Sequence, residues 1–140
     1  MVELMPFDRA YGIVCIACEA SSESELCQQA VAASLRNRVR AKRWEPTIAG
    51  CVVQRYQYSE FLPDQNDNLN LERVINKPET DPEIIAAAKA YDTVMADEGL
   101  DPSQQATHFF SDGIPLPVWA APPAQLAVKI GRVSFWKDVK

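Results

Sequence analysis

The chain has 140 residues, an apolar fraction of 47% and a charged fraction of 24%, values that are ordinary for one globular domain with a core of its own. Its formal net charge of −5 argues against a nucleic-acid-binding protein, because such proteins present dense basic patches. No apolar run approaches the roughly 20 residues that a membrane span needs, and the N-terminus shows no secretory signal. We therefore expect a single domain over residues 1–140, made in the cytoplasm without membrane insertion.

The first half of the chain predicts two long helices. Small and apolar residues fill positions 10–20, which indicates a buried helix. Ser21, Ser22 and Ser24 are all cap-type residues, Ser22 and Glu25 have the spacing of a capping box, and a second helix is predicted over residues 23–41. Its apolar positions recur three or four residues apart: Cys27, Ala30, Val31, Leu35 and Val39. Near its end lie basic residues that suit the helix dipole and that we expect to cap the helix and be solvated, with contact to an anionic polymer as the alternative: Arg36, Arg38, Arg40, Lys42 and Arg43.

The middle of the chain predicts two further helices and a loop between them. Thr47 can cap a short helix that includes positions 48–52. Residues 62–71 are rich in turn-forming residues and predict a surface loop, a candidate groove wall or lid. Asp81 and Pro82 combine a cap residue with proline at the first helical position, and predict a helix that ends at Gly99.

The C-terminal part has a different character. Residues 106–110 and 129–136 are rich in β-branched and aromatic side chains and predict short strands, with a proline-rich loop over 115–123 between them. The predicted fold class is therefore α+β and mostly α, with a small antiparallel β element near the C-terminus.

The four cysteines raise the question of a metal site. Cys15 and Cys18 have ligand spacing, but no second pair follows and the only histidine is His108. Cys27 and Cys51 also lie among apolar residues. We predict four small buried side chains, no metal and no cofactor.

Glu19 is the first candidate for chemistry. It comes directly after the apolar segment 11–18, so its carboxyl is expected at the edge of a core. A carboxyl that is half out of water holds its proton more readily, which suits a general acid near neutral pH. The alternative is that Glu19 and Glu23 are solvated acids at a helix start.

Seven short segments follow one another in an order that is typical of one family. They are Glu19-Ala20-Ser21-Ser22-Glu23, Cys27-Gln28, the end of an alanine- and valine-rich helix at Asn37-Arg38-Val39, Gln57-Tyr58-Ser59, Ala106-Thr107-His108-Phe109, Pro117-Val118-Trp119, and Ile130-Gly131 with Phe135. Together they resemble the SleB-like cell-wall hydrolases, typified by the catalytic domain of the spore-cortex lytic enzymes and found also in phages and Gram-negative bacteria. The chain departs from the family pattern where Cys18 and Cys27 replace glycines and Ser21-Ser22 replaces Arg-Gly.

The resemblance implies a lysozyme-like domain that cleaves the glycan strand of peptidoglycan as a lytic transglycosylase. Glu19 matches the family's catalytic glutamate, and Glu23 is a candidate supporting residue whose alternative role is structural. The acid would protonate the leaving oxygen, and the C6 hydroxyl of muramic acid would then attack, giving a 1,6-anhydro end. We expect a monomer that resembles phage endolysins and reaches the wall, in the host periplasm, through membrane pores made by another protein.

Other residues are candidates for binding the sugars. Polar groups can bond N-acetyl and hydroxyl groups, and aromatic faces can stack on sugar rings. Each has a structural alternative in core packing or loop bonding. These candidates are Asn37, Gln57, Tyr58, Phe61, His108 and Trp119.

Three alternatives stay open. A muramidase would use water in place of the C6 hydroxyl. A non-catalytic glycan-binding or virion structural domain would keep the scaffold alone. A zinc peptidase or amidase is disfavoured by the single histidine and the lack of a His-x-x-x-His pattern.

Overall fold

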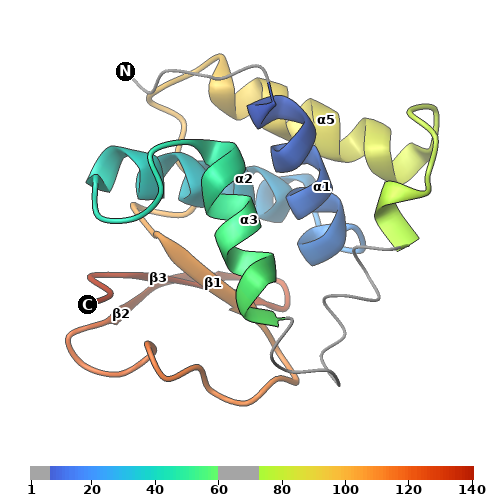
Figure 1. The fold of residues 1–140 in the computed structure, drawn as a ribbon. Coiled ribbons are helices and arrows are strands. Elements are labelled where there is room, and N and C mark those ends of the chain that lie inside the picture. The colour runs from blue at the N-terminus through green and yellow to red at the C-terminus, as the bar shows by residue number, and fades with distance from the viewer. Residues whose placement is uncertain (1–6, 60–72) are drawn as a thin grey trace.

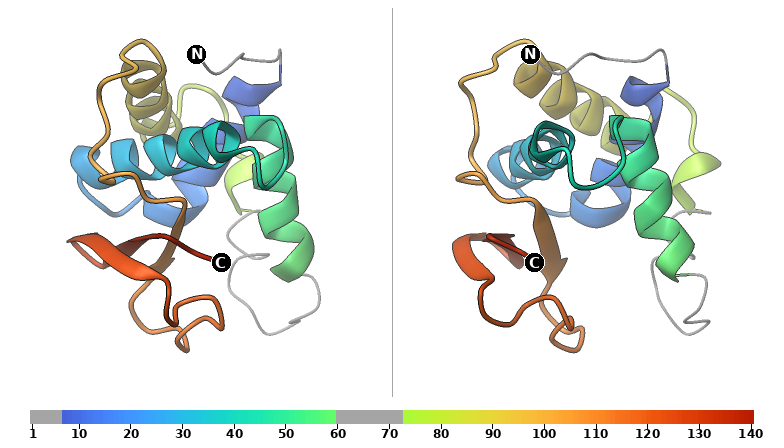
Figure 2. Two further views of the ribbon diagram at one scale, coloured as in Figure 1. Left: turned by 90° about the vertical axis from the view of Figure 1, so that its left-hand side faces the viewer. Right: turned by 60° about the vertical axis from the view of Figure 1, so that its left-hand side comes forward.

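The protein folds as a group of helices set against a small sheet (Figure 1). The structure is a computed structural model that describes the backbone of residues 7–59 and 73–140, and the side chains of residues 7–54 and 73–140. The helices lie on one side of the molecule, and the sheet with its long connecting loop lies on the other (Figure 2). This arrangement confirms the predicted α+β class with a small C-terminal β element.

Four helices occupy the predicted positions. They are α1 (Asp8–Ala20), α2 (Glu25–Ala41), α3 (Ile48–Ser59) and α5 (Pro82–Met95). The predicted cap of α2 at Ser22 is wrong: the side chain of Ser24 accepts the hydrogen bond from the backbone of Cys27, because the chain makes a further turn after α1. Asp81 caps α5 as predicted, but the helix ends at Met95 and not at Gly99. The loop predicted over 62–71 lies outside the described residues.

Helix α2 is the centre of the fold. It contacts α1, α3, α5 and two strands of the sheet. Its inward positions are small or medium-sized, and Ala30, Ala32 and Ala33 are completely buried. Small side chains let neighbouring helices approach closely, so this composition explains how one helix can be surrounded by the others.

Helix α1 is fixed along its length by α3 and α5. The buried carboxylate of Asp8 accepts a hydrogen bond from the backbone of Ala49 at 2.8 Å, at the start of α3. The ring of Tyr91 in α5 packs directly on Gly12, where any Cβ would collide with it. These contacts fix the direction in which the C-terminal end of α1 points.

Within the described ranges, the sheet has three antiparallel strands in the order β1-β3-β2. They are β1 (His108–Ser111), β2 (Gln125–Ile130) and β3 (Val133–Lys137). The single strand predicted over 129–136 is therefore wrong: the segment turns back on itself at Gly131, which has φ +59°. Only glycine adopts that conformation without strain, so the glycine in the pattern marks a hairpin. The proline-rich segment 115–123 is a loop, as predicted.

The basic group at the end of α2 does not behave as one solvated cluster. Arg36 is 2% exposed, and its guanidinium donates to the carbonyl oxygens of Val94 and Asp97 at 2.6 and 3.0 Å. It also donates to the carbonyl oxygen of Leu100. Arg36 therefore satisfies the C-terminal carbonyls of α5, which corrects the prediction that it is solvated.

All four cysteines are buried, as the sequence predicted, and none forms a disulfide, a point that the sequence left open. Burial raises the pKa of the Cys27 thiol to about 12 and also raises the pKa of Cys51. No helix in the described ranges has the length and apolar character needed to cross a membrane.

Candidate active site

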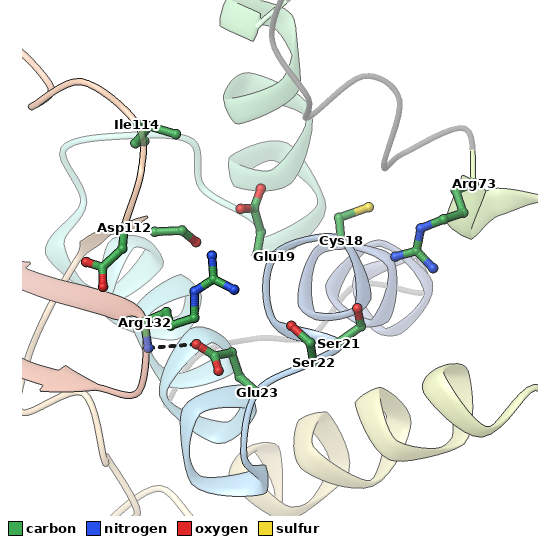
Figure 3. A pocket seen from close by; sticks show the side chains of 10 residues that line it. Cys18, Glu19, Ser21, Ser22, Glu23, Arg73, Asp112, Ile114 and Arg132 are labelled. Carbon is green, nitrogen blue, oxygen red and sulfur yellow. Dashed lines mark hydrogen bonds between the residues drawn. The ribbon is translucent and has the colours of Figure 1, made fainter.

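A cavity of about 310 Å³ opens where the C-terminal end of α1 meets the sheet (Figure 3). Its walls come from four parts of the chain: the junction between α1 and α2, the helical turn at 73–75, the end of β1 with the loop after it, and the hairpin turn between β2 and β3. The lining residues are mostly polar: Cys18, Glu19, Ser21, Ser22, Glu23, Arg73, Ser111, Asp112, Ile114 and Arg132. Both acids singled out in the sequence therefore lie in one cavity.

Glu19 lies in the last turn of α1, half-buried at the cavity wall. Residues one turn before it, Cys15 and Ile16, are completely buried, so Glu19 continues the buried face of the helix to its end. The end of the helix is secured by Gln28, whose buried side-chain amide donates to the carbonyl oxygen of Ala20 at 3.0 Å. The sequence predicted this position for Glu19 at the core edge, but not the supporting role of Gln28.

Glu23 connects the helical part to the sheet. Its carboxylate accepts a hydrogen bond from the backbone N–H of Arg132 at 2.7 Å, and Figure 3 shows this bond across the cavity. A Cβ at Gly131 would lie 3.1 Å from both carboxylate oxygens of Glu23. The approach of the turn to Glu23 thus depends on the lack of a side chain at residue 131.

The cavity is also lined by three charged residues that the sequence did not single out. Asp112 pairs with Lys129 at 3.0 Å, and Arg73 pairs with Glu83 at 2.8 Å. Arg132 projects its side chain from the hairpin turn toward the side where Glu19 lies (Figure 3). Only the glycine in the strand pattern could have pointed to Arg132, because a glycine there signals a turn or bulge.

The candidate sugar-binding residues are dispersed. The amide group of Asn37 donates to the carboxylate of Asp101 and to the carbonyl oxygen of Ala106, both at 2.9 Å, and Asn37 does not line the cavity. The side chains of Gln57 and Tyr58, and the whole of Phe61, lie outside the described residues. Their binding roles stay predictions.

His108 and Trp119 belong to an aromatic cluster that also includes Trp44, Phe110 and Trp136. The ring of His108 lies between Trp44 and Trp119, with centroid distances of 5.1 and 4.8 Å. Trp119 also packs on Phe110 and Trp136 at 5.7 and 6.3 Å. Neither His108 nor Trp119 is among the residues that line the cavity of Glu19. The cluster attaches the loop that carries Trp119 to the sheet, and a role in sugar stacking stays a prediction.

The sequence and the fold both have relatives. The family model of the cell wall hydrolases matches residues 22–136, and the chain belongs to this family. The matched range includes Glu23 and the hairpin turn but begins after Glu19. A comparison with functionally curated proteins gave no match.

Two solved structures share the fold. The catalytic domain of the Bacillus cereus SleB protein has a TM-score of 0.69 at 23% identity, with 96% of this chain and 93% of that chain covered. The catalytic domain of SleB from Bacillus anthracis, described as a germination-specific lytic transglycosylase, has a TM-score of 0.68 at 23% identity, with 95% and 96% covered. The likeness extends over nearly the whole chain and confirms the predicted lysozyme-like architecture.

Proposed function

We propose that this cell wall hydrolase is a lytic transglycosylase that cleaves the glycan strands of peptidoglycan, with Glu19 as its single catalytic acid and base. The observation that carries the proposal is the position of Glu19, half-buried in the cavity between the helices and the sheet. The fold shared with a lytic transglycosylase catalytic domain supports the reaction type.

The reaction needs one proton donor that later becomes a proton acceptor. The protonated carboxyl of Glu19 gives its proton to the glycosidic oxygen, and the bond between that oxygen and C1 of muramic acid breaks. The C6 hydroxyl oxygen of the same sugar bonds to C1, and its proton returns to Glu19. The products are a free 4-hydroxyl end and a 1,6-anhydro-muramic end, and no water is consumed.

The other carboxylates of the cavity favour this route over a retaining hydrolase, which needs a second carboxylate as nucleophile. Glu23 already accepts the hydrogen bond from Arg132, and Asp112 already pairs with Lys129. A hydrolytic muramidase remains the alternative, with water in place of the C6 hydroxyl.

The product mass separates the two reactions. Purified peptidoglycan digested by the wild type should release anhydro-muropeptides, which are about 18 Da lighter than hydrated products because no water is added. A digestion in water enriched in the heavy oxygen isotope should leave the new ends unlabelled. Labelled, reducing ends would identify a muramidase instead, and intact strands would favour a non-catalytic wall-binding domain.

The setting of the reaction is part of the proposal. The family resemblance includes phage enzymes, and on that basis we propose a lysis enzyme of the endolysin type, made in the cytoplasm and acting on the wall in the periplasm of its host. Expression inside a Gram-negative host should cause lysis only when a pore-forming membrane protein is produced as well. Lysis without that protein, or none with it, would contradict this part of the proposal.

A further inference from the structure

Arg132 has a backbone that is fixed from two sides. Its N–H donates to the carboxylate of Glu23 at 2.7 Å, and its carbonyl oxygen accepts from the backbone of Asp112 at 2.8 Å. The first contact comes from the junction between α1 and α2, and the second from the end of β1. The turn residue is thus positioned by both walls of the cavity that it lines.

The guanidinium of Arg132 has no such fixed partner. In the described part of the chain, no carboxylate lies within ion-pair distance of it and no carbonyl accepts a hydrogen bond from it. The cavity's other arginine differs, because Arg73 pairs with Glu83 at 2.8 Å. Arg132 therefore places a cationic side chain, unpaired among the described residues, in the cavity of Glu19 (Figure 3). Its backbone is held in place by the two hydrogen bonds.

A planar guanidinium binds carboxylates through two parallel hydrogen bonds. The chain itself carries a formal net charge of −5 and would repel an anionic strand, so a local cation at the site offsets that repulsion. Muramyl residues carry carboxylates, either on the lactyl group or on the stem peptide attached to it. The free guanidinium and the chemistry of the substrate are complementary.

We propose that Arg132 is a specificity residue that binds a carboxylate of the muramyl residue and so selects strands with charged substituents over neutral ones. This inference rests on the proposed function and names the substrate class of the same site. Glu23 is the positioning residue, because it holds the turn from which Arg132 projects.

The test measures binding without cleavage, using the Glu19→Gln protein as the reference. The first probe is peptidoglycan strands stripped of stem peptides by an amidase, which leaves free lactyl carboxylates. The second is the same strands with their carboxylates converted to neutral amides by a carbodiimide and ammonia. The third is strands that keep their stem peptides, titrated both with free carboxylates and with carboxylates amidated in the same way. Each probe is titrated with the reference protein and with versions of it that add Arg132→Gln, Arg132→Lys or Arg40→Gln. Arg40 is the control, because it is an exposed arginine of α2 outside the cavity.

The reference protein should bind charged strands on the order of tenfold more tightly than amidated strands, as expected for a charge-assisted hydrogen-bonded pair. Arg132→Gln should abolish this preference, Arg132→Lys should keep part of it, and Arg40→Gln should keep all of it. If Arg132→Gln loses the preference with peptide-free strands, the bound group is the lactyl carboxylate. If it loses the preference only with peptide-bearing strands, the bound group is a carboxylate of the stem peptide. Equal melting temperatures exclude unfolding as the cause.

The inference is overturned if Arg132→Gln keeps the full preference, if the reference protein distinguishes charged from amidated strands neither with nor without stem peptides, or if no strand binds. These results leave the proposed function to its own test, because cleavage by the wild type is measured separately. If the wild type cleaves glycan strands but Arg132 does not affect strand preference, the role of Arg132 is rejected and the proposed function stands.

Discussion

The carboxylate of Glu23 accepts a hydrogen bond from the backbone N–H of Arg132, a residue 109 positions further along the chain, at 2.7 Å. This contact ties the junction after α1, where Glu19 lies, to the hairpin turn on the opposite wall of the cavity. The side chain of Glu23 therefore links the two walls of the cavity, in addition to the packing of α2 on the sheet. The role of Glu23 can be tested apart from that of Glu19.

Replacing Glu23 by alanine should remove this connection. We expect the free energy of unfolding to fall by about 1 kcal/mol, the usual value of one hydrogen bond, and glycan cleavage to fall about tenfold or more because the cavity wall is displaced. Glu23→Gln keeps an acceptor oxygen and should retain most of both properties. Chemical denaturation and a cleavage assay measure the two effects.

The matched control for Glu23 is Glu25→Ala, since Glu25 lies two residues away and, among the described residues, makes only an exposed pair with Lys89 at 3.6 Å. It should change stability by less than about 0.5 kcal/mol. If Glu23→Ala behaves like Glu25→Ala in both assays, Glu23 has no positioning role.

Replacing Gly131 by alanine should strain the same contact from the other side. A residue with a Cβ costs roughly 1–2 kcal/mol at φ +59°, and the new methyl group would press on the carboxylate of Glu23. Gly99→Ala is the control, because its Cβ would meet only Asp97, at an ordinary 3.5 Å. Thermal unfolding of the two variants should show a loss at Gly131 only, and equal melting temperatures would contradict the role assigned to the turn.

Replacing Arg36 by methionine should destabilise the fold although Arg36 lies in a basic cluster. The change removes the donor from the carbonyl oxygens of Val94, Asp97 and Leu100, the first in a buried bond and the other two in partly buried bonds, which should cost about 3 kcal/mol. Arg40→Met, one turn further along α2 and exposed, should cost less than about 0.5 kcal/mol. Similar denaturation midpoints for the two variants would refute the capping role of Arg36.

The protein should lose stability in alkaline solution. Burial raises the pKa of Cys27 to about 12 from its ordinary value of 9.0, so the unfolded chain releases this proton at lower pH than the folded one. The stabilisation is complete below pH 9 and is lost as the pH rises through about 12, with a slope of at most about 1.4 kcal/mol per pH unit for this group. Denaturation measured from pH 8 to 11 should show a smaller slope in Cys27→Ala, and an unchanged slope would contradict the prediction.

The helices could be predicted from the sequence because their signals are local. The recurrence of Cys27, Val31 and Leu35 along α2 and the Asp81-Pro82 start of α5 both lie within one element. The hairpin was missed since an apolar run such as 129–136 reads as one strand until the turn at Gly131 is known. The cap of α2 was misplaced by two residues because Ser22 and Ser24 are equally good cap residues, and the backbone path decides between them.

Residues of the candidate site could be predicted from the sequence only where a single segment of the chain determines their position. Glu19 could be found because its own segment places it at the end of a buried helix face. Arg132 and Asp112 could not, since their proximity to Glu19 depends on the pairing of the helical part with the sheet. Arg36 was misassigned for the same reason: its carbonyl partners lie at least 58 positions away in the sequence.

The most direct test of the central claim compares Glu19→Gln with Glu23→Gln in one assay of glycan-strand cleavage, with folding and strand binding measured for both. We expect Glu19→Gln to fold and bind strands but to lose about 10²- to 10⁴-fold in cleavage rate, the usual contribution of a general acid and base, and to release almost no anhydro products. Glu23→Gln should keep most of the wild-type rate. A Glu19→Gln protein within tenfold of the wild type, with Glu23→Gln inactive, would mean that the catalytic glutamate is Glu23 and not Glu19.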